Sequence, residues 1–240
     1  MQAGRAGGCY NPEVPLSIYL HIPFCIHRCA YCDFNTYAGL EAQMPAYVAA
    51  LQQELRQVGC ALSGVAGPPP EAHTVFFGGG TPSLLPSSSI EAILGTVRTG
   101  FRLTEDAEVT LEANPGSIAR QDLERLLRAG VNRLSLGAQS AQPADLRLLE
   151  RGHTFADVVA AVGQARTAGF DNINLDLIYG LPWQAGKGWV DTMRRAIDLR
   201  PEHLSLYALS LEHGTPLRAW VERGLVASPD PDLAADMYEQ

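Results

Sequence analysis

Residues 172–178 read N-I-N-L-D-L-I, in which polar and apolar residues alternate from Asn172 to Leu177. Successive side chains of a β-strand point to opposite faces, so Ile173, Leu175 and Leu177 share one face and the polar residues share the other. A parallel strand that is covered by helices on both faces is expected to be apolar throughout. This stretch therefore indicates a strand of a barrel, with helices on the outer face and a polar interior.

Five further stretches are predicted to be strands, and several of them repeat the alternation. They are Ser17–Ile22, His73–Phe77, Glu108–Ala113, Arg133–Gly137 and His203–Ala208. Helices are predicted between the strands, at Pro45–Val58, after a capping box at residues 88–91, and at Ile118–Ala129, Phe155–Ala168 and Trp189–Leu199. Strands and helices that alternate in this way favour an α/β fold, an incomplete (β/α)6 TIM-like barrel.

Polar residues stand at the C-terminal ends of several predicted strands, where barrels of this kind carry their sites. Glu112, Gln139 and Asp176 lie there on the polar face, either as ligand-binding residues or as hydrogen-bonded interior residues without a ligand. Arg151 also has two open roles. It is a solvated surface charge or a clamp for a carboxylate, which the guanidinium group suits geometrically.

The composition excludes several classes of protein. The chain has 240 residues, of which 46% are hydrophobic and 18% charged, with a net charge of −8 and an isoelectric point near 5.2. Nonspecific binding of nucleic acid needs a basic surface, so no nucleic-acid partner is expected. No apolar run reaches the roughly 20 residues that span a membrane, and the first fifteen residues lack the apolar core of a secretory signal. A cytoplasmic protein with reduced cysteines is therefore expected.

Three of the five cysteines fall within eight residues, in the spacing C-x3-C-x2-C. Cys25, Cys29 and Cys32 follow the first predicted strand directly, which places them in a loop at the C-terminal mouth of the barrel. In a reducing compartment such a group indicates metal binding or catalysis more than disulfides. The spacing leaves open a zinc ion with His27 or Asp33 as fourth ligand, an iron–sulfur cluster with one open iron, and unliganded thiols. The other two cysteines are predicted to be ordinary thiols.

A glycine-rich stretch, F-F-G-G-G-T-P-S at residues 76–83, ends the second predicted strand. It fits neither the dinucleotide fingerprint nor the P-loop. Glycines let a ligand approach the main chain closely and expose backbone groups to it, although many such stretches are only turns. Because it stands beside the cysteine loop, the stretch is predicted to form a wall of the same pocket.

These motifs together resemble those of the radical S-adenosylmethionine (SAM) enzymes. Within that superfamily, the sequences YLHIPFC, YCDF, FFGGGTPS, EANP, RLSLGAQS and NLDLIYGLPWQ are similar to the oxygen-independent coproporphyrinogen III oxidase group. The resemblance runs from about Ser17 to Tyr238. It implies that Cys25, Cys29 and Cys32 hold a [4Fe–4S] cluster, and that S-adenosyl-L-methionine chelates the open iron through its amino and carboxylate groups.

The resemblance also assigns the SAM-binding residues position by position. Tyr19 matches a residue against the methionine end of SAM, and Tyr31 matches an aromatic position near the adenosine. Gly79, Gly80 and Thr81 match the turn that receives the methionyl amino group. The positions that match the residues binding the ribose and the carboxylate are Glu112, Gln139, Arg151 and Asp176.

Phe34 distinguishes two functional branches of this group. The oxidases carry an additional cysteine two residues after the third ligand, where this chain has Phe34. The C-D-F form resembles the heme chaperones, so the resemblance implies heme as bound cargo and heme-accepting apoproteins as partners. The alternative is an enzyme, an oxygen-independent coproporphyrinogen III oxidase that acts on a porphyrin precursor. The resemblance also implies an electron donor as a partner, because cleavage of SAM at the cluster is reductive.

The chain is expected to divide into three parts. Residues 1–16 are expected to be a flexible N-terminal segment and residues 17–228 the radical SAM core domain. Residues 229–240 are expected to begin a C-terminal region that is truncated, and the heme-binding residue is expected in the missing part. The Asp-Pro pair at residues 230–231 suits the start of a helix, which is expected to begin near Leu233.

Overall fold

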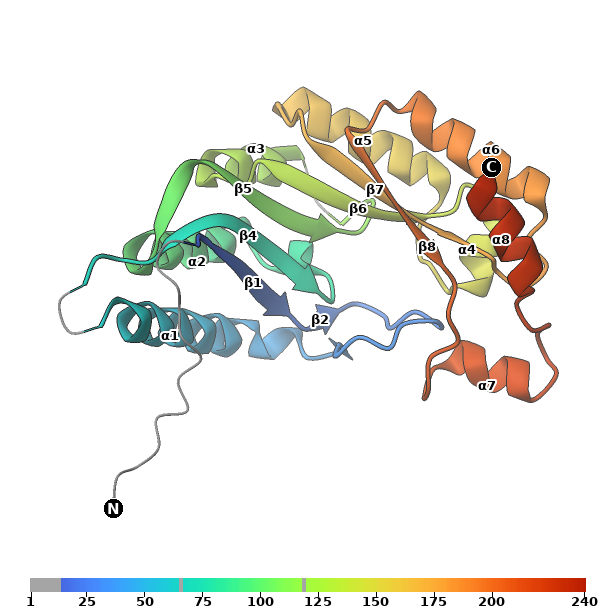
Figure 1. Ribbon diagram of the computed structural model, residues 1–240, viewed down its shortest axis with the longest axis horizontal. Helices are drawn as coiled ribbons and strands as arrows, with labels where there is room; N and C mark the ends of the chain where they lie inside the picture. Colours follow the sequence, from blue (N-terminus) through green and yellow to red (C-terminus); the bar gives the residue numbers. More distant parts are fainter. Residues whose placement is uncertain (1–13, 65–66, 118–119) are drawn as a thin grey trace, which may run out of the picture.

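The computed structural model describes residues 14–64, 67–117 and 120–240, and its centre is a curled parallel sheet (Figure 1). Six strands follow one another in the order β1-β4-β5-β6-β7-β8, and every neighbouring pair is parallel. These strands are β1 (Leu16–Ile22), β4 (Glu71–Gly79), β5 (Arg102–Ala113), β6 (Arg133–Gln139), β7 (Ile173–Tyr179) and β8 (His203–Ala208). The sheet stays open between β1 and β8, so the predicted incomplete (β/α)6 barrel is confirmed.

Helices follow the strands, most of them along the outer side of the sheet and the short one at Pro216–Glu222 apart from it, past the end of β8 (Figure 1). They are α1 (Met44–Ser63), α2 (Ser87–Gly100), α3 (Arg120–Ala129), α4 (Pro143–Leu148), α5 (Phe155–Ala168), α6 (Gly186–Asp198), α7 (Pro216–Glu222) and α8 (Pro231–Glu239), with 3-10 turns at Glu41–Gln43 and Pro82–Leu84. Within the described residues, no helix is long and apolar enough to cross a membrane.

The ends of two helices test the predicted capping signals. The capping box predicted at residues 88–91 is wrong, because α2 begins at Ser87 and its N-cap residue, Pro86, makes no side-chain cap bond. The extended backbone of Pro86 sets the start of the helix earlier, which puts the serines inside the first turn. The helix expected near Leu233 begins at Pro231, and the Asp230 carboxylate accepts N–H bonds from Asp232 and Leu233. For the predicted helix Ile118–Ala129, the first two residues lie outside the described part of the chain.

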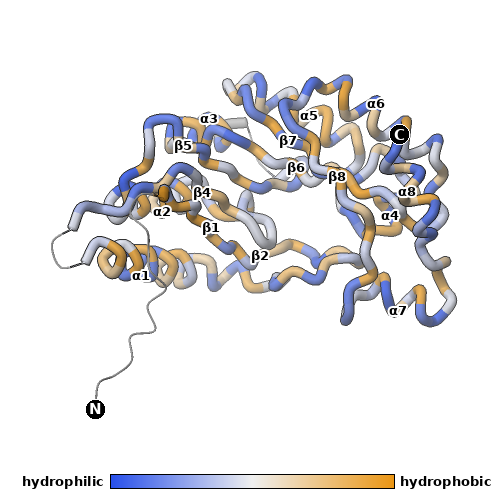
Figure 2. The backbone as a smooth tube through the Cα atoms, viewed as in Figure 1, coloured by the Kyte–Doolittle hydropathy of each residue, from blue (hydrophilic) through white to orange (hydrophobic). Residues whose placement is uncertain are grey.

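The apolar face of the strands forms the core against the helices. Along the tube in Figure 2, hydrophobic and hydrophilic segments alternate, as the sequence pattern predicts. Leu111, Leu134 and Leu175 on adjacent strands are fully buried, and so is Ile93 on α2. Complete burial of one such side chain stabilises a fold by about 1.5–3 kcal/mol. The outer face of the sheet therefore holds the fold together, and the inner face is left to polar groups.

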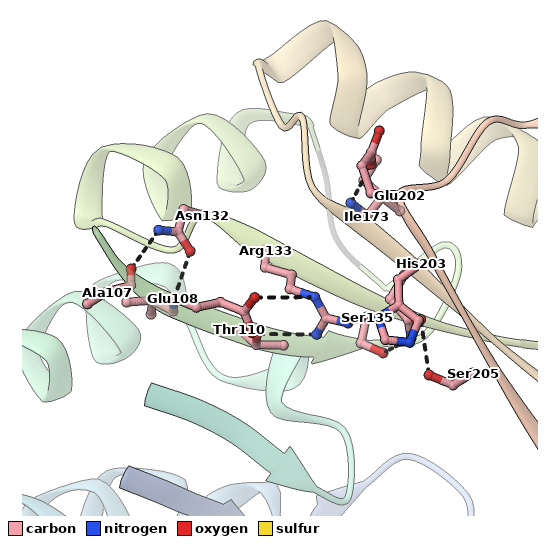
Figure 3. A network of polar contacts seen from close by, with 12 residues as sticks. Ala107, Glu108, Thr110, Asn132, Arg133, Ser135, Ile173, Glu202, His203 and Ser205 are labelled. Atoms are coloured by element: carbon pink, nitrogen blue, oxygen red, sulfur yellow. Dashed lines mark hydrogen bonds and ion pairs between the residues drawn. The ribbon is translucent and has the colours of Figure 1, made fainter. Parts of the chain in front are cut away.

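The polar inner face carries a hydrogen-bonded network at the N-terminal ends of the strands (Figure 3). Arg133, the first residue of β6, is only 9% exposed. Its Nη1 donates to Thr110 Oγ1 at 3.3 Å, its Nη2 lies 3.4 Å from His203 Nδ1, and its Nε lies 3.8 Å from the Glu108 carboxylate. This network joins β5, β6 and β8, so part of the polar face is structural and lies away from the cysteines.

Candidate functional site

The cysteine loop is held by backbone contacts from distant parts of the chain. A two-stranded parallel sheet, β2 (Phe24–Cys25) and β3 (Tyr37–Ala38), closes the loop at its base. The Ala30 N–H donates to the Leu149 carbonyl at 3.3 Å, and the Leu217 N–H donates to the Ala30 carbonyl at 2.9 Å. Leu149 follows α4 and Leu217 lies in α7, so the loop is fixed over the C-terminal mouth of the barrel, as predicted.

Two of the three cysteine sulfurs accept a hydrogen bond from another part of the site. Thr81 Oγ1 donates to Cys25 Sγ at 3.7 Å, and Arg151 Nη1 donates to Cys29 Sγ at 3.5 Å. Burial raises the thiol pKa of Cys25 and of Cys32, and the neighbouring thiols raise both further. Among the described residues, no three Cys, His, Asp or Glu side chains are arranged to hold a metal ion. Cys29 and Cys32 nevertheless lie close enough to Cys25 to raise its thiol pKa.

Arg151 connects the cysteine loop to the strands. Its Nη2 donates to Asn114 Oδ1 at 2.5 Å and to the Gly137 carbonyl at 2.8 Å, and Asn114 Nδ2 donates to Thr81 Oγ1 at 3.1 Å. These contacts complete a polar path from Cys25 to Cys29. Arg151 Nε is buried and has no hydrogen-bond partner in the described part of the chain. The reading of Arg151 as a solvated surface charge is therefore wrong, and one buried donor points to a ligand that the chain does not supply.

Two acidic residues lie on the inner face beside this path. Glu112 Oε2 accepts the Gly79 N–H at 3.1 Å, and burial together with the nearby Asp176 raises the pKa of Glu112 to about 7. Asp176 accepts bonds from Ser135 Oγ and Asn174 Nδ2, both at 2.9 Å, while burial raises its pKa. The two carboxylates predicted from strand alternation are therefore brought together by the fold.

A bulge places Gln139 at the same site. The pairing of β6 with β7 shifts between Gly137 and Gln139, and Gln139 has a φ of 65°. A Cβ on Gly137 would lie 3.0 Å from Gln139 Nε2 and 3.1 Å from Arg151 Nη2. The strand predicted to end at Gly137 therefore continues to Gln139, whose side chain turns back over Gly137 toward Arg151.

The glycine-rich stretch is shaped by its neighbours. A Cβ on Gly79 would lie 2.5 Å from the His21 ring, and one on Gly80 would lie 2.6 Å from the Phe24 carbonyl oxygen. The N–H groups of Gly80 and Thr81 donate at 2.8 Å to the carbonyls at the ends of β1 and β2, and that of Gly79 donates to a carboxylate. The expectation that these glycines expose backbone groups to a ligand is thus wrong for the N–H groups of Gly79 and Gly80, because both already have acceptors in the chain. The carbonyl groups are left as possible contacts for a ligand.

The two predicted tyrosines also lie at this mouth. Tyr19 is 58% exposed, stacks on Phe76 with ring centroids 6.1 Å apart, and its hydroxyl lies 3.1 Å from His21 Nδ1. Tyr31 lies beside Arg151, and burial raises the pKa of its hydroxyl. Tyr19 is thus exposed on β1, and Tyr31 is a half-buried residue of the cysteine loop itself.

The histidines near the site act as hydrogen-bonding groups. His21 Nε2 lies 2.9 Å from the Asn35 carbonyl, and His153 Nε2 lies 3.1 Å from the Ala138 carbonyl. Burial and then Arg151 lower the pKa of His153 to about 4, so it is neutral at physiological pH. His27 is exposed and lies 3.4 Å from Glu150.

Sequence reasoning missed several residues of the site. Asn114, which bridges Thr81 and Arg151, belongs to the quoted motif E-A-N-P but received no role. Ser135 and Asn174, which hold Asp176, stood on the polar face of their strands, so strand alternation was the signal for them. Thr36 follows the cysteines closely, but no pattern in the sequence marks it as a residue of the site.

The scan against family models matches the radical SAM superfamily over residues 19–196, so the chain belongs to this superfamily. It is 43% identical over 231 residues to "Heme chaperone HemW" of Mycobacterium tuberculosis, which covers 95% of this chain and 58% of that relative. Heme chaperone HemW of Escherichia coli is 40% identical, covering 94% of this chain and 58% of the relative.

Among solved structures, coproporphyrinogen III oxidase (HemN) from Escherichia coli superposes with a TM-score of 0.83 at 30% identity, over 95% of this chain and 52% of that one. The chain therefore spans little more than half the length of these relatives. The sequence-based assignment to this superfamily, on the side of the heme chaperones, is supported.

Proposed function

We propose that the chain is a heme chaperone-like protein on a radical SAM core, which binds heme and transfers it to apoproteins. In this proposal Cys25, Cys29 and Cys32 hold a [4Fe–4S] cluster, and the residues around the mouth hold S-adenosyl-L-methionine. When bound, such a cluster supplies an open iron and a reducing electron. The residues of the chain bind and orient the ligands.

The donor set fits an iron–sulfur cluster better than a zinc ion. A zinc site needs four ligands that converge on one ion. A cluster with several irons spreads its thiolate ligands over those irons, so the sulfurs need not meet at one point. Three neighbouring thiols with hydrogen bonds from Thr81 and Arg151 to their sulfurs match the second description.

The groups around the cysteines match the chemistry of SAM. The unpartnered Nε of Arg151 suits the carboxylate of the methionine end. Glu112 and Asp176 offer acceptors for the ribose hydroxyls, and Gln139 adds amide groups beside them. The carbonyl side of Gly79, Gly80 and Thr81 suits the methionyl ammonium group, which needs acceptors. Tyr19 and Tyr31 supply aromatic surfaces at the two ends of the ligand.

The observation that carries the heme part of the proposal is the 43% and 40% identity to two proteins named heme chaperones. Phe34 agrees with this assignment. It is 61% exposed at the position where the oxidases of the resemblance have an additional cysteine. Oxygen-independent coproporphyrinogen III oxidase is the second candidate, and the TM-score of 0.83 to an enzyme of that name favours it.

One anaerobic experiment separates the two candidates. The purified protein is reconstituted with iron and sulfide, titrated with heme, and incubated with coproporphyrinogen III, SAM and a reductant. A heme chaperone is expected to bind heme stoichiometrically and to leave coproporphyrinogen III unchanged. Conversion to protoporphyrinogen IX without heme binding would establish the oxidase instead.

The cluster assignment has its own matched pair of variants. Cys29→Ala is expected to lose the bound iron and the visible absorption of the reconstituted protein. Cys60→Ala, at an exposed free cysteine on α1, is expected to keep both. Equal iron content in the two variants would overturn the ligand assignment.

A further inference from the structure

Thr36 carries a buried hydroxyl that makes no well-formed hydrogen bond in the described part of the chain. The residue is 6% exposed, and among the described residues its Oγ1 has no hydrogen-bond partner. Leaving a buried hydroxyl unpaired costs about 1–3 kcal/mol, so such a group in a folded protein calls for an explanation.

The backbone holds Thr36 against the cysteines. It directly precedes β3, which pairs in parallel with β2, the strand that contains Cys25. The Tyr37 N–H donates to the Pro23 carbonyl at 2.7 Å. This bond holds the segment that contains Thr36 against the residues that precede Cys25. Burial raises the thiol pKa of Cys25 and of Cys32, and the nearby Thr36 hydroxyl opposes that rise at both. One hydroxyl therefore lies next to two of the three sulfurs.

We propose that Thr36 is a hydrogen-bond donor to the sulfur ligands of the bound cluster, at Cys25 or Cys32, and that it sets the reduction potential of the cluster. This inference rests on the cluster site proposed above. Thr36 would be the third side chain that donates a hydrogen bond to a cysteine sulfur, because Thr81 donates to Cys25 and Arg151 donates to Cys29. Thr36 is within reach of Cys25 and of Cys32, and at Cys32 it adds a side-chain donor to the backbone N–H of Phe34.

The effect on the potential has a definite sign. Reduction adds one negative charge to the cluster, and a donor directed at a ligand sulfur stabilises the more negative form. The Thr36 hydroxyl therefore raises the reduction potential, and its removal lowers it.

The test compares Thr36→Val with Thr36→Ser. Valine keeps the shape of threonine and removes the hydroxyl, whereas serine keeps the hydroxyl. The reconstituted proteins are titrated anaerobically with dithionite, which gives one electron to each cluster and is itself oxidised, and the midpoint potential is read from the visible absorption. Thr36→Val is expected to make reduction about tenfold less favourable, or about 59 mV for one electron. Thr36→Ser is expected to stay within a fraction of that change.

A surface variant and an iron assay separate the possible outcomes. Thr99→Val on α2 removes an exposed hydroxyl that bonds only within its helix, at Gly95, and is expected to leave the potential unchanged. Equal potentials in Thr36→Val and the wild type, with iron bound in both, would overturn the role of Thr36 and leave the proposed function intact. A wild type that binds no iron would overturn the proposed function itself. If Thr36→Val loses iron while Thr36→Ser retains it, this difference in iron content supports a contact between the Thr36 hydroxyl and the cluster.

Discussion

Glu112 is expected to destabilise the ligand-free protein at neutral and alkaline pH. Burial and the nearby Asp176 raise its pKa from the ordinary 4.5 to about 7. The folded state therefore binds this proton more tightly than the unfolded state, so the contribution of Glu112 to stability is most favourable below pH 4.5 and becomes less favourable as the pH rises to about 7. Each pKa unit corresponds to about 1.4 kcal/mol, which makes the cost of ionised Glu112 about 3 kcal/mol at pH 8.

The variant Glu112→Gln removes this ionisation and keeps an oxygen acceptor for the Gly79 N–H. Urea unfolding followed by circular dichroism, at intervals from pH 4 to pH 8 without SAM, is expected to show the variant about 3 kcal/mol more stable at pH 8. The two proteins are expected to converge near pH 4. The exposed Glu91→Gln on α2 is the matched control for a Glu-to-Gln change outside the barrel interior. A difference between Glu112→Gln and the wild type that stays constant with pH would refute the reasoning.

Three further variants test the hydrogen bonds and the close packing at the mouth. Asn174→Leu removes an amide donor to Asp176, and a bond to a charged group is worth about 1.5–3 kcal/mol. The dissociation constant for SAM is expected to rise about tenfold or more by calorimetry, and an unchanged constant would show that this bond does not matter. Gly80→Ala places a Cβ 2.6 Å from the Phe24 carbonyl oxygen and is expected to lower the melting temperature by several degrees. Gly95→Ala in the open middle of α2 is expected to stabilise the fold by up to about 1 kcal/mol, and equal melting temperatures for these two glycine variants would contradict the packing argument.

The regular part of the fold is local in origin and could therefore be predicted. Strand alternation has a period of two residues, so the six strands were visible from short windows, and the resulting barrel is observed. The short elements α4, α7, β2 and β3 were not predicted, since two to seven residues carry too little pattern. The bulge at Gln139 was also invisible, because it depends on how Gly137 and Arg151 pack across the strand.

The site was predicted in part for the same reason. Alternation marks Arg133 and Asp176 alike as polar residues on the inner face, although Arg133 supports the base of the barrel and Asp176 stands at the mouth. Whether such a residue lies at the base or at the mouth of the barrel follows from its position along the strand. The path through Asn114 and the contacts of Thr36 depend on segments that meet only in the folded chain, so no spacing in the sequence reports them.

The separation of Cys29 and Arg151 along the chain sets an order of events during biosynthesis. Arg151 is made 122 residues after Cys29, and Leu217, which binds the backbone of the same loop, is made later still. At the usual rate of translation, Arg151 is synthesised on the order of ten seconds after the three cysteines. In a nascent chain the cysteines are therefore present before Arg151 and Leu217, the two residues that complete the contacts of their loop.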